Sequence, residues 1–315
     1  MVLVALSALL HAIEKERVSV FADLLVWNAT ESGADNWAQV FSTSGFSPTI
    51  DVLDVAFDWN PGIRLGLNWD MGYDGWDTQF FYTWFCTHGY DQDMAPAGGY
   101  VASSFIGNFF ANNSGGTGLS GPKYQSANIK WSLYFSIFDW ELGRNFQVAN
   151  ILTLRPFIGL KGGWINQRID SNWQNPIDTT PSFTSAVENL KNDFWGIGPS
   201  LGLNTKWDLG SSFHFFGDFS GALLWGHWTF ADLYQNNVPE SVTVNLSNIN
   251  GVAPMTRAFM GFGWQKCWSG SRICMRLGYE MQFWLNQLQY YVYNTARLNN
   301  QLSFQGGVFD FCYDF

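Results

Sequence analysis

The chain has 315 residues, of which 47% are hydrophobic and 18% aromatic, and its formal net charge is -10 at pH 7. A nucleic-acid partner is not expected, because Lys and Arg are scattered singly and no basic tract is present to neutralise phosphates. No run of eighteen uncharged apolar residues occurs, which excludes a transmembrane helix and leaves a closed β-barrel as the way this chain could span a bilayer.

Residues 1–12, MVLVALSALLHA, resemble the apolar core of a secretory signal peptide, with the small residue Ala12 at a cleavage position. The basic segment that normally precedes such a core is missing. We therefore expect a truncated or remnant signal, with an exposed first strand as the alternative. Residues 17–315 are expected to form a single barrel domain.

The clearest predicted strand covers residues 63–73, IRLGLNWDMGY, in which every odd position is large and apolar and every even position is polar or Gly. A period of two is typical of a β-strand with one apolar face. Residues 127–137 repeat the pattern, with Lys130 on the polar, inward face. The side chains expected to face lipid are Leu65, Leu67, Ala127, Ile129, Trp131, Leu133, Phe135, Ile137, Leu201 and Leu203.

Short turn-like links alternate along the chain with long polar segments. The short links lie at 73–76, 147–150, 208–211 and 268–271, and the long segments at 30–50, 88–125, 168–191, 229–253 and 287–300. Short periplasmic turns and long extracellular loops are typical of outer-membrane barrels. The sequence thus predicts an all-β, antiparallel transmembrane barrel of about ten strands, with twelve as the alternative. The predicted strands are 17–29, 51 or 62–73, 76–87, 126–146, 151–167, 192–207, 211–228, 254–266, 272–286 and 301–315.

The last nine residues, GVFDFCYDF, carry an aromatic ring at every second position. The four rings would form one apolar ribbon, with Asp310, Cys312 and Asp314 on the opposite face. This ending resembles the C-terminal strand by which outer-membrane barrels are recognised for assembly, and the rings fit an aromatic girdle. We expect the barrel-assembly machinery as a partner and the signal in Phe309, Phe311, Tyr313 and Phe315. The alternative is the last strand of a soluble sandwich.

Five segments together resemble one known family: FDWNPGIRLGL at 57–67, DGWD at 74–77, DWELGRNF at 139–146, LTLRPFIGL at 152–160 and FWGIGP at 194–199. They are similar to the Legionella-type major outer membrane proteins, a porin family also seen in chlamydia-related bacteria. The resemblance covers most of residues 17–315. It implies a pore-forming barrel integral to a bacterial outer membrane, and it brings no catalytic residue and no substrate. No cofactor is expected.

The inward positions of the predicted strands collect charged side chains of both signs. Such a mixture can line a water-filled pore and select solutes by charge, or its members can pair with one another and plug a narrow lumen. We predict a porin for passive diffusion of ions and small hydrophilic solutes; a structural or adhesive barrel with a plugged lumen is the alternative, and a homo-oligomer is left open. The expected pore-lining residues are Arg64, Asp70, Asp77, Lys130, Arg155, Lys161, Lys206, Asp218, Arg257, Arg276 and Glu280, with Asp58 beside them.

Catalysis is not expected. His88 and His227 lie near Asp91, Asp93 and Asp232 in the sequence, as a protease at the barrel rim would require, but no Ser/His/Asp order stands out. His214, beside Asp218 on an inward position, is interpreted as a hydrogen-bonded lumen residue.

The four cysteines, Cys86, Cys267, Cys274 and Cys312, show no CxxC or His/Cys spacing, so no metal site is expected. A disulfide between Cys267 and Cys274, across a hairpin turn, is left open. Aromatic side chains in the predicted loops are expected to fold back onto the barrel mouth, with binding of a surface partner as the alternative. They are Trp37, Phe41, Phe105, Phe109, Phe110 and Phe183.

Overall fold

The computed structural model describes residues 17–44, 47–103, 123–177, 183–238, 241–268, 271–292 and 296–315, and the predicted signal core at 1–12 lies outside them. The described residues are almost entirely β-structure, with one short 3-10 helix, η1 (Ala34–Asn36). Within them no helix is both long and apolar enough to cross a membrane. The strands are β1 (Arg17–Glu31), β2 (Ala38–Ser44), β3 (Ser47–Leu53), β4 (Asn60–Asp70), β5 (Trp76–Met94), β6 (Tyr100–Ser103), β7 (Lys123–Arg144), β8 (Phe146–Ala149), β9 (Leu152–Ile177), β10 (Ser185–Gly210), β11 (Phe213–Asn236), β12 (Ser241–Trp268), β13 (Ser271–Val292) and β14 (Ala296–Asp314).

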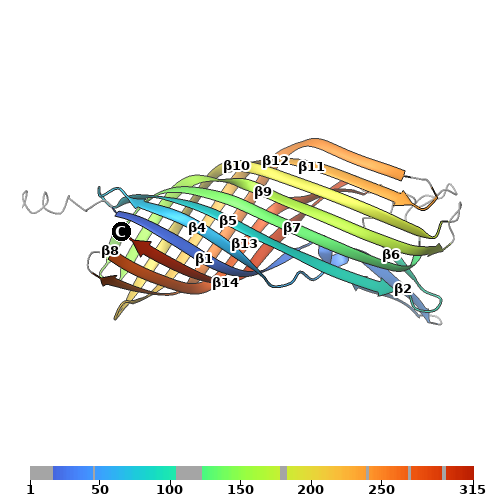
Figure 1. Ribbon diagram of the computed structural model, residues 1–315, viewed down its shortest axis with the longest axis horizontal. Helices are drawn as coiled ribbons and strands as arrows, with labels where there is room; N and C mark the ends of the chain where they lie inside the picture. The colour runs from blue at the N-terminus through green and yellow to red at the C-terminus, as the bar shows by residue number, and fades with distance from the viewer. Residues whose placement is uncertain are drawn as a thin grey trace, which may run out of the picture.

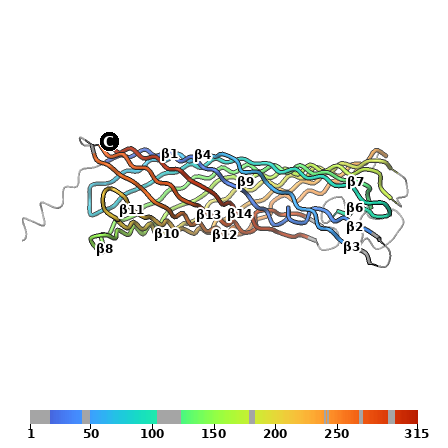
Figure 2. Tube along the Cα trace, turned by 90° about the horizontal axis from the view of Figure 1, so that it is seen from below, coloured from blue at the N-terminus to red at the C-terminus, as the bar shows by residue number. Residues whose placement is uncertain are grey.

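Ten strands form a closed antiparallel ring in the order β1-β4-β5-β7-β9-β10-β11-β12-β13-β14. The ring closes where β14 pairs with β1, from Ser19 opposite Asp314 to Glu31 opposite Leu302. Figures 1 and 2 show the resulting elongated barrel. A ring without a free edge satisfies the backbone groups from strand to strand, as a bilayer requires.

The sheet has fourteen strands, so the predicted number, ten, is wrong for the sheet as a whole. The difference lies in four strands of four to seven residues that stand outside the ring. β3, β2 and β6 extend the sheet from β7 at the end where the long connections lie, and β8 pairs with β9 at the other end. They are too short to show a recognisable period of two, whereas the ring strands occupy the ten predicted positions.

Two hairpin turns lie at the end of the barrel that carries the C terminus (Figure 1). Asp74 and Gly75 have φ values of 52° and 72°, and the Trp76 amide donates to the Tyr73 carbonyl at 3.0 Å. Ser211 and Ser212 form the other turn, also with positive φ. Positive φ at both central residues is the hairpin geometry that Asp-Gly favours, so the predicted short link at 73–76 is confirmed as a turn. The second turn lies at 211–212, at the end of the link predicted for 208–211, because β10 continues to Gly210.

At the opposite end, most of the predicted long loops are strand. β9 and β10 each have 26 residues and leave only 178–184 as their connection, where a loop over 168–191 was expected. Similarly, β11 and β12 run to Asn236 and from Ser241. About 9–11 tilted residues suffice to cross the hydrocarbon of a bilayer. The barrel therefore projects well beyond the membrane on this side.

The polarity of the two strand faces exchanges part-way along the barrel. In β7, Phe138, Trp140 and Leu142 point outwards while Asp139 and Glu141 point into the lumen. Towards the long connections, the outward side chains of β7 become polar and the inward ones apolar: Ser126, Asn128, Lys130 and Ser132 are outside, and Ile129, Trp131, Leu133 and Phe135 are buried inside.

The exchange falls at one level on neighbouring strands. It lies near Phe135 in β7, which pairs with Ile165 in β9, where outward Trp164 gives way to outward Asn166, Arg168 and Asp170. We call the part of the barrel on the side of the short turns the inner half, and the part on the side of the long connections the outer half. The inner half has apolar residues outside, as lipid requires, and the outer half has them inside, as water requires.

The predicted lipid-facing positions divide at this level. Leu65, Leu67 and Leu201 are exposed on the outer surface of the inner half, and Leu203 lies on the same face, as predicted. The other predictions are wrong because alternation shows which residues share a face but not whether water or lipid lies outside it. The side chains that are buried in the lumen instead are Ala127, Ile129, Trp131, Leu133, Phe135 and Ile137.

Candidate functional site

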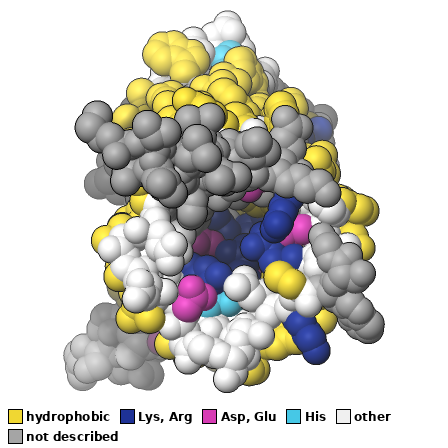
Figure 3. Space-filling model, turned by 90° about the vertical axis from the view of Figure 1, so that its left-hand side faces the viewer, with side chains coloured by type: hydrophobic (Ala, Val, Ile, Leu, Met, Phe, Trp, Pro, Cys, Tyr) yellow, Lys and Arg dark blue, Asp and Glu magenta, His cyan; other side chains and the backbone are white. Residues whose placement is uncertain are grey.

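The inner half of the lumen contains a cavity of about 280 Å³. Viewed from the end that carries the C terminus, the molecule is hollowed, and Lys and Arg side chains are prominent in the hollow (Figure 3). We call this cavity the charged chamber. Its charged lining consists of six cations, Arg64, Arg155, Lys206, Arg257, Arg272 and Arg276, and four carboxylates, Asp23, Glu141, Asp218 and Asp310.

At the top of the chamber, Glu280 on β13 is shared by two arginines. Its carboxylate accepts from Arg64 Nη2 at 2.7 Å and from Arg257 Nη2 at 2.9 Å. Arg64 also binds Asp23 Oδ2 at 3.0 Å and donates from Nε to Thr83 Oγ1 at 3.0 Å. The group ties β1, β4, β5, β12 and β13 together across the lumen.

A second charged group lies on the β5, β7 and β9 side. Arg155 contacts Asp77 Oδ1 at 2.5 Å and Glu141 Oε2 at 2.8 Å, and it donates to Asn204 Oδ1 at 2.8 Å. Lys161 pairs with Asp139 above it. Because each of these charges is removed from bulk water, loss of one partner would leave a buried charge uncompensated, at a cost of about 3–5 kcal/mol.

Arg272 and Arg276, nearer the mouth, are more exposed than the carboxylates that they bind. The Arg276 side chain is 30% exposed and binds Asp218 Oδ2 at 3.1 Å and also Asp310, whose side chain is 3% exposed. Lys206 Nζ lies 3.2 Å from Asp208 Oδ1 and 3.1 Å from Gln265 Oε1. At Arg272 and Arg276 the wall of the chamber therefore presents positive charge in front of buried carboxylates, although the chain as a whole is acidic.

Above the chamber, an aromatic cluster fills the lumen. Phe135 on β7 and Trp284 on β13 have ring centroids 5.4 Å apart, and Phe304 lies 4.6 Å from Phe135. β7 and β13 are five strands apart in either direction around the ring, so this contact joins opposite walls. Trp27 and Phe85 pack against the same group. All five rings are buried, with exposed fractions of at most 1%.

The segment between β1 and β4 adds to the closure from the outer end. Trp37 is buried against Trp173 with ring centroids 5.7 Å apart, and its Nε1 donates to Asp91 Oδ2 at 2.8 Å. Phe57 packs on Trp131 at 6.2 Å. Trp37 and Phe183 are buried, as the fold-back prediction requires, and Phe41 stacks on Tyr100. Phe105, Phe109 and Phe110 lie outside the described residues.

One of the predicted pore-lining residues does not line the lumen. Lys130 is exposed on the outer surface of the outer half, because the polarity exchange turns the polar face of β7 outwards there. Asp70, at the end of β4, lies opposite Asp77 on the inward face at the mouth of the barrel and accepts from the Gly72 amide at 3.0 Å. Asp58 is exposed outside the ring strands. The residues that do face the lumen are Arg64, Asp77, Arg155, Lys161, Lys206, Asp218, Arg257, Arg276 and Glu280.

The described residues do not bring the histidines and aspartates of the protease hypothesis together. His88 is exposed on the outer surface, and His227 Nδ1 lies 3.0 Å from Asn250 Oδ1. Asp232 is buried on the lumen side and Asp91 receives the bond from Trp37, whereas Asp93 is exposed. His214 lines the chamber, as expected for a lumen residue.

All four cysteines are free thiols. Cys267 lies opposite Arg272 rather than Cys274, so the hairpin disulfide between Cys267 and Cys274 is not formed. Cys274 instead lies opposite Cys312 on β14. Sequence spacing could not reveal this neighbour, because strand register alone brings the two residues together.

The family model described as "Legionella pneumophila major outer membrane protein precursor" matches residues 12–315. The chain belongs to this family. No curated protein matches it. Among solved structures, it is similar to the outer membrane protease OmpT from Escherichia coli, with 11% identity, coverage of 95% of this chain and 96% of that chain, and a TM-score of 0.42.

Two further solved barrels are similar. A Pseudomonas aeruginosa FadL homologue has 12% identity, coverage of 97% and 91%, and a TM-score of 0.32. A major outer membrane protein from Thermus thermophilus has 9% identity, coverage of 96% and 100%, and a TM-score of 0.32. Family membership and the closed ring together place this Legionella-type protein in the outer membrane as an integral β-barrel.

Proposed function

We propose that this protein is a closed structural barrel of the outer membrane, which holds a rigid β-projection outside the cell. The observation that carries the proposal is the contact between Phe135 and Trp284, which joins opposite walls across the lumen. A pore for passive diffusion needs a continuous water path, and the aromatic cluster interrupts one.

The side chains that would close the lumen belong to the strands of the barrel wall. Its buried apolar side chains come from β1, β5, β7 and from every ring strand between β9 and β14. Full burial of one such side chain contributes about 1.5–3 kcal/mol, so opening the lumen would expose many of them at once. The outer half is accordingly a packed core of the kind that soluble β-proteins have.

A passive porin for ions and small hydrophilic solutes is the second candidate. The charged chamber favours it, because cations line a water-accessible cavity in the membrane-embedded half. The pore would then need a route around or through the aromatic cluster. Neither proposal includes a catalytic activity.

Conductance in planar bilayers distinguishes the two functions. The wild-type protein and a Phe135→Ala/Trp284→Ala double variant are refolded and checked for heat-resistant migration before measurement. Trp225→Ala provides the matched control, because Trp225 is 60% exposed on the lipid-facing surface. We expect the wild type and the control to be silent and the double variant to give discrete conductance steps.

Conductance steps from the wild type would overturn the closed barrel in favour of the porin. Charge reversal at Arg155 or Arg276 would then test the chamber, because a residue in the conduction path must change ion selectivity. A double variant that folds and remains silent would show that the aromatic cluster is not the barrier.

A further inference from the structure

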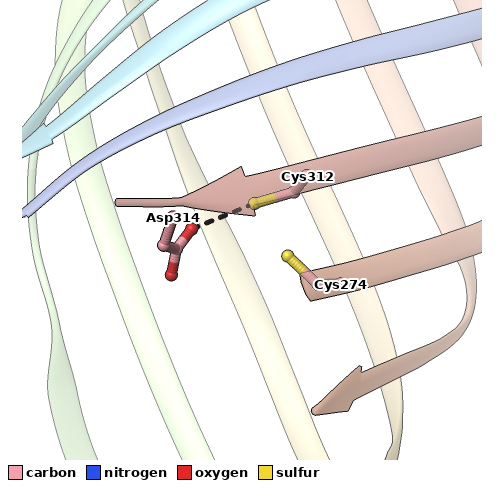
Figure 4. A group of neighbouring side chains, drawn as sticks. All are labelled: Cys274, Cys312 and Asp314. Atoms are coloured by element: carbon pink, nitrogen blue, oxygen red, sulfur yellow. Dashed lines mark hydrogen bonds between the residues drawn. The ribbon is translucent and has the colours of Figure 1, made fainter. Parts of the chain in front are cut away.

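Two thiols and one carboxylate meet at the inner end of the lumen. Cys274 on β13 is directly opposite Cys312 on β14, and Asp314 follows two residues later on the same inward face. One ligand atom from each lies within 4.8 Å of the others. Figure 4 shows the sulfur of Cys274 directed towards the space beside Cys312 and Asp314.

We propose that Cys274, Cys312 and Asp314 bind a thiophilic divalent cation of the Zn²⁺ class. Thiolate sulfur and carboxylate oxygen are ligands that Zn²⁺ takes at about 2.3 Å and 2.0–2.2 Å, which places tetrahedral ligand atoms about 3.5–3.8 Å apart. Cys312 Sγ already lies 3.2 Å from Asp314 Oδ1. Side-chain rotation of Cys274 supplies the remaining approach without movement of the paired strands.

The surroundings of the triad suit a metal ion. Arg272 Nε binds Asp314 Oδ2, which leaves Oδ1 as the oxygen directed at the thiols. A carboxylate held in this way by a second partner is a common feature of metal sites, since the outer contact fixes the orientation of the ligand. Two thiolates and one carboxylate carry three negative charges, and a divalent cation together with Arg272 would balance them.

The site leaves one coordination position open. Cys274, Cys312 and Arg272 all line the charged chamber, so the fourth position of a tetrahedral ion would face its water. Three protein ligands and a water are typical of zinc sites that are not purely structural. The ion would also link β13 to β14, the strand that closes the ring against β1.

Metal binding by the refolded full-length barrel, reduced before metal is added, tests the site. Zinc is measured after dialysis, and Co²⁺ is used as a spectroscopic probe whose thiolate charge-transfer band reports sulfur ligation. We expect one zinc per barrel and a Co²⁺–thiolate band in the wild type. Both signals should be lost in Cys274→Ser and in Cys312→Ser. The Asp314→Asn variant should bind at least roughly tenfold more weakly, because even loss of an outer partner of a ligand typically costs about 10–100-fold in metal affinity.

Cys86→Ser and Cys267→Ser provide matched controls, because each removes a thiol outside the triad. Both should retain the zinc and the band. Equal zinc content in Cys274→Ser and the wild type would overturn the proposal, and so would loss of the band in a control. A wild-type barrel isolated from outer membranes with Cys274 and Cys312 joined in a disulfide would also overturn it, since the pair would then be a covalent cross-link.

Discussion

The same strands form the inner and outer halves of this barrel, but their apolar faces point in opposite directions in the two halves. In the inner half, lipid lies outside and paired charges lie inside; in the outer half, water lies outside and an aromatic core lies inside. β7 passes through both environments without a break in its pairing with β5. The comparison shows that a strand can exchange its apolar face simply by changing the parity of its sequence pattern at the membrane boundary.

The largest effect is expected in the outer core. Trp131→Ala removes a fully buried ring and leaves Gln167 Oε1 without the 2.9 Å bond that it accepts from Trp131 Nε1. Large-to-small changes of this kind cost about 3–5 kcal/mol in the free energy of unfolding. Trp164→Ala is the control on the outer surface of the inner half. Equal losses for the two variants, measured by urea titration in lipid vesicles, would contradict the assignment of the faces.

The next largest effect is expected on the lipid-facing surface of the inner half. Leu201, which is 67% exposed, should face the hydrocarbon, and Leu201→Arg should destabilise the barrel by about 2–4 kcal/mol. The same residue placed on the outer surface of the outer half, in Asn189→Arg, should change the free energy of unfolding by less than about 0.5 kcal/mol. If both substitutions cost the same, no lipid boundary lies between these two positions on β10.

An effect that is smaller for each pH unit concerns the outer half. Glu31 lies inside the barrel beyond the apolar belt, where the outward neighbour Thr30 is already polar, and burial raises the pKa of Glu31 to about 8. Its protonated form is therefore favoured in the folded barrel. The contribution of protonated Glu31 to the free energy of unfolding is complete below about pH 4.5 and is lost as the pH rises through 8. The free energy of unfolding falls over this range by at most about 1.4 kcal/mol per pH unit.

Glu31→Gln should remove this slope while keeping the hydrogen-bonding capacity of the side chain. Unfolding free energies measured from about pH 4 to about pH 9 for both proteins check it. Parallel curves for the wild type and the variant would show that Glu31 ionises in the folded barrel as it does in the unfolded chain.

The smallest effect on stability is expected at the chain end. Phe315 is 67% exposed, and its amide donates to the Val18 carbonyl at 2.9 Å. Deletion of Phe315 should change the free energy of unfolding by less than about 1 kcal/mol, since little of its ring is buried. If the terminal rings are the assembly signal, the amount of inserted barrel should nevertheless fall markedly. Wild-type levels of surface protein in the deletion strain would remove Phe315 from that signal.

Local patterns were sufficient to predict the strands, one turn and several outward-facing side chains of the inner half. Leu65 and Leu67 show their alternation directly, and Asp74-Gly75 shows its turn by residue type. The terminal ribbon is also as predicted, with Phe309, Phe311 and Phe315 exposed on one face and Asp310 and Asp314 buried on the other. In these segments the apolar face lies on the outside of the barrel and the polar face lies towards the lumen, as the alternation predicts for a strand in a bilayer.

The face assignments of the outer half could not be predicted in the same way, because the sequence of a single strand does not show whether lipid or water surrounds it. The alternation around Trp131 fits a lipid-facing and a core-facing strand equally well, and Lys130 follows whichever assignment is made. Only the length of the strands, which carries β7 and its neighbours beyond the bilayer, decides between them. The proximity of Cys274 and Cys312 likewise depends on register between strands, which no spacing motif encodes.

The pairing of β1 with β14 has a consequence for the order of events during biogenesis. Ser19 and Asp314, which lie far apart in the sequence, are paired neighbours in the finished ring. Contacts between residues so distant along the chain are slow to form, because the chain between them must be ordered first. No partially synthesised chain can close the cylinder, so translation has to finish before insertion is complete, and one edge of β1 stays unpaired within the chain until the last strand arrives.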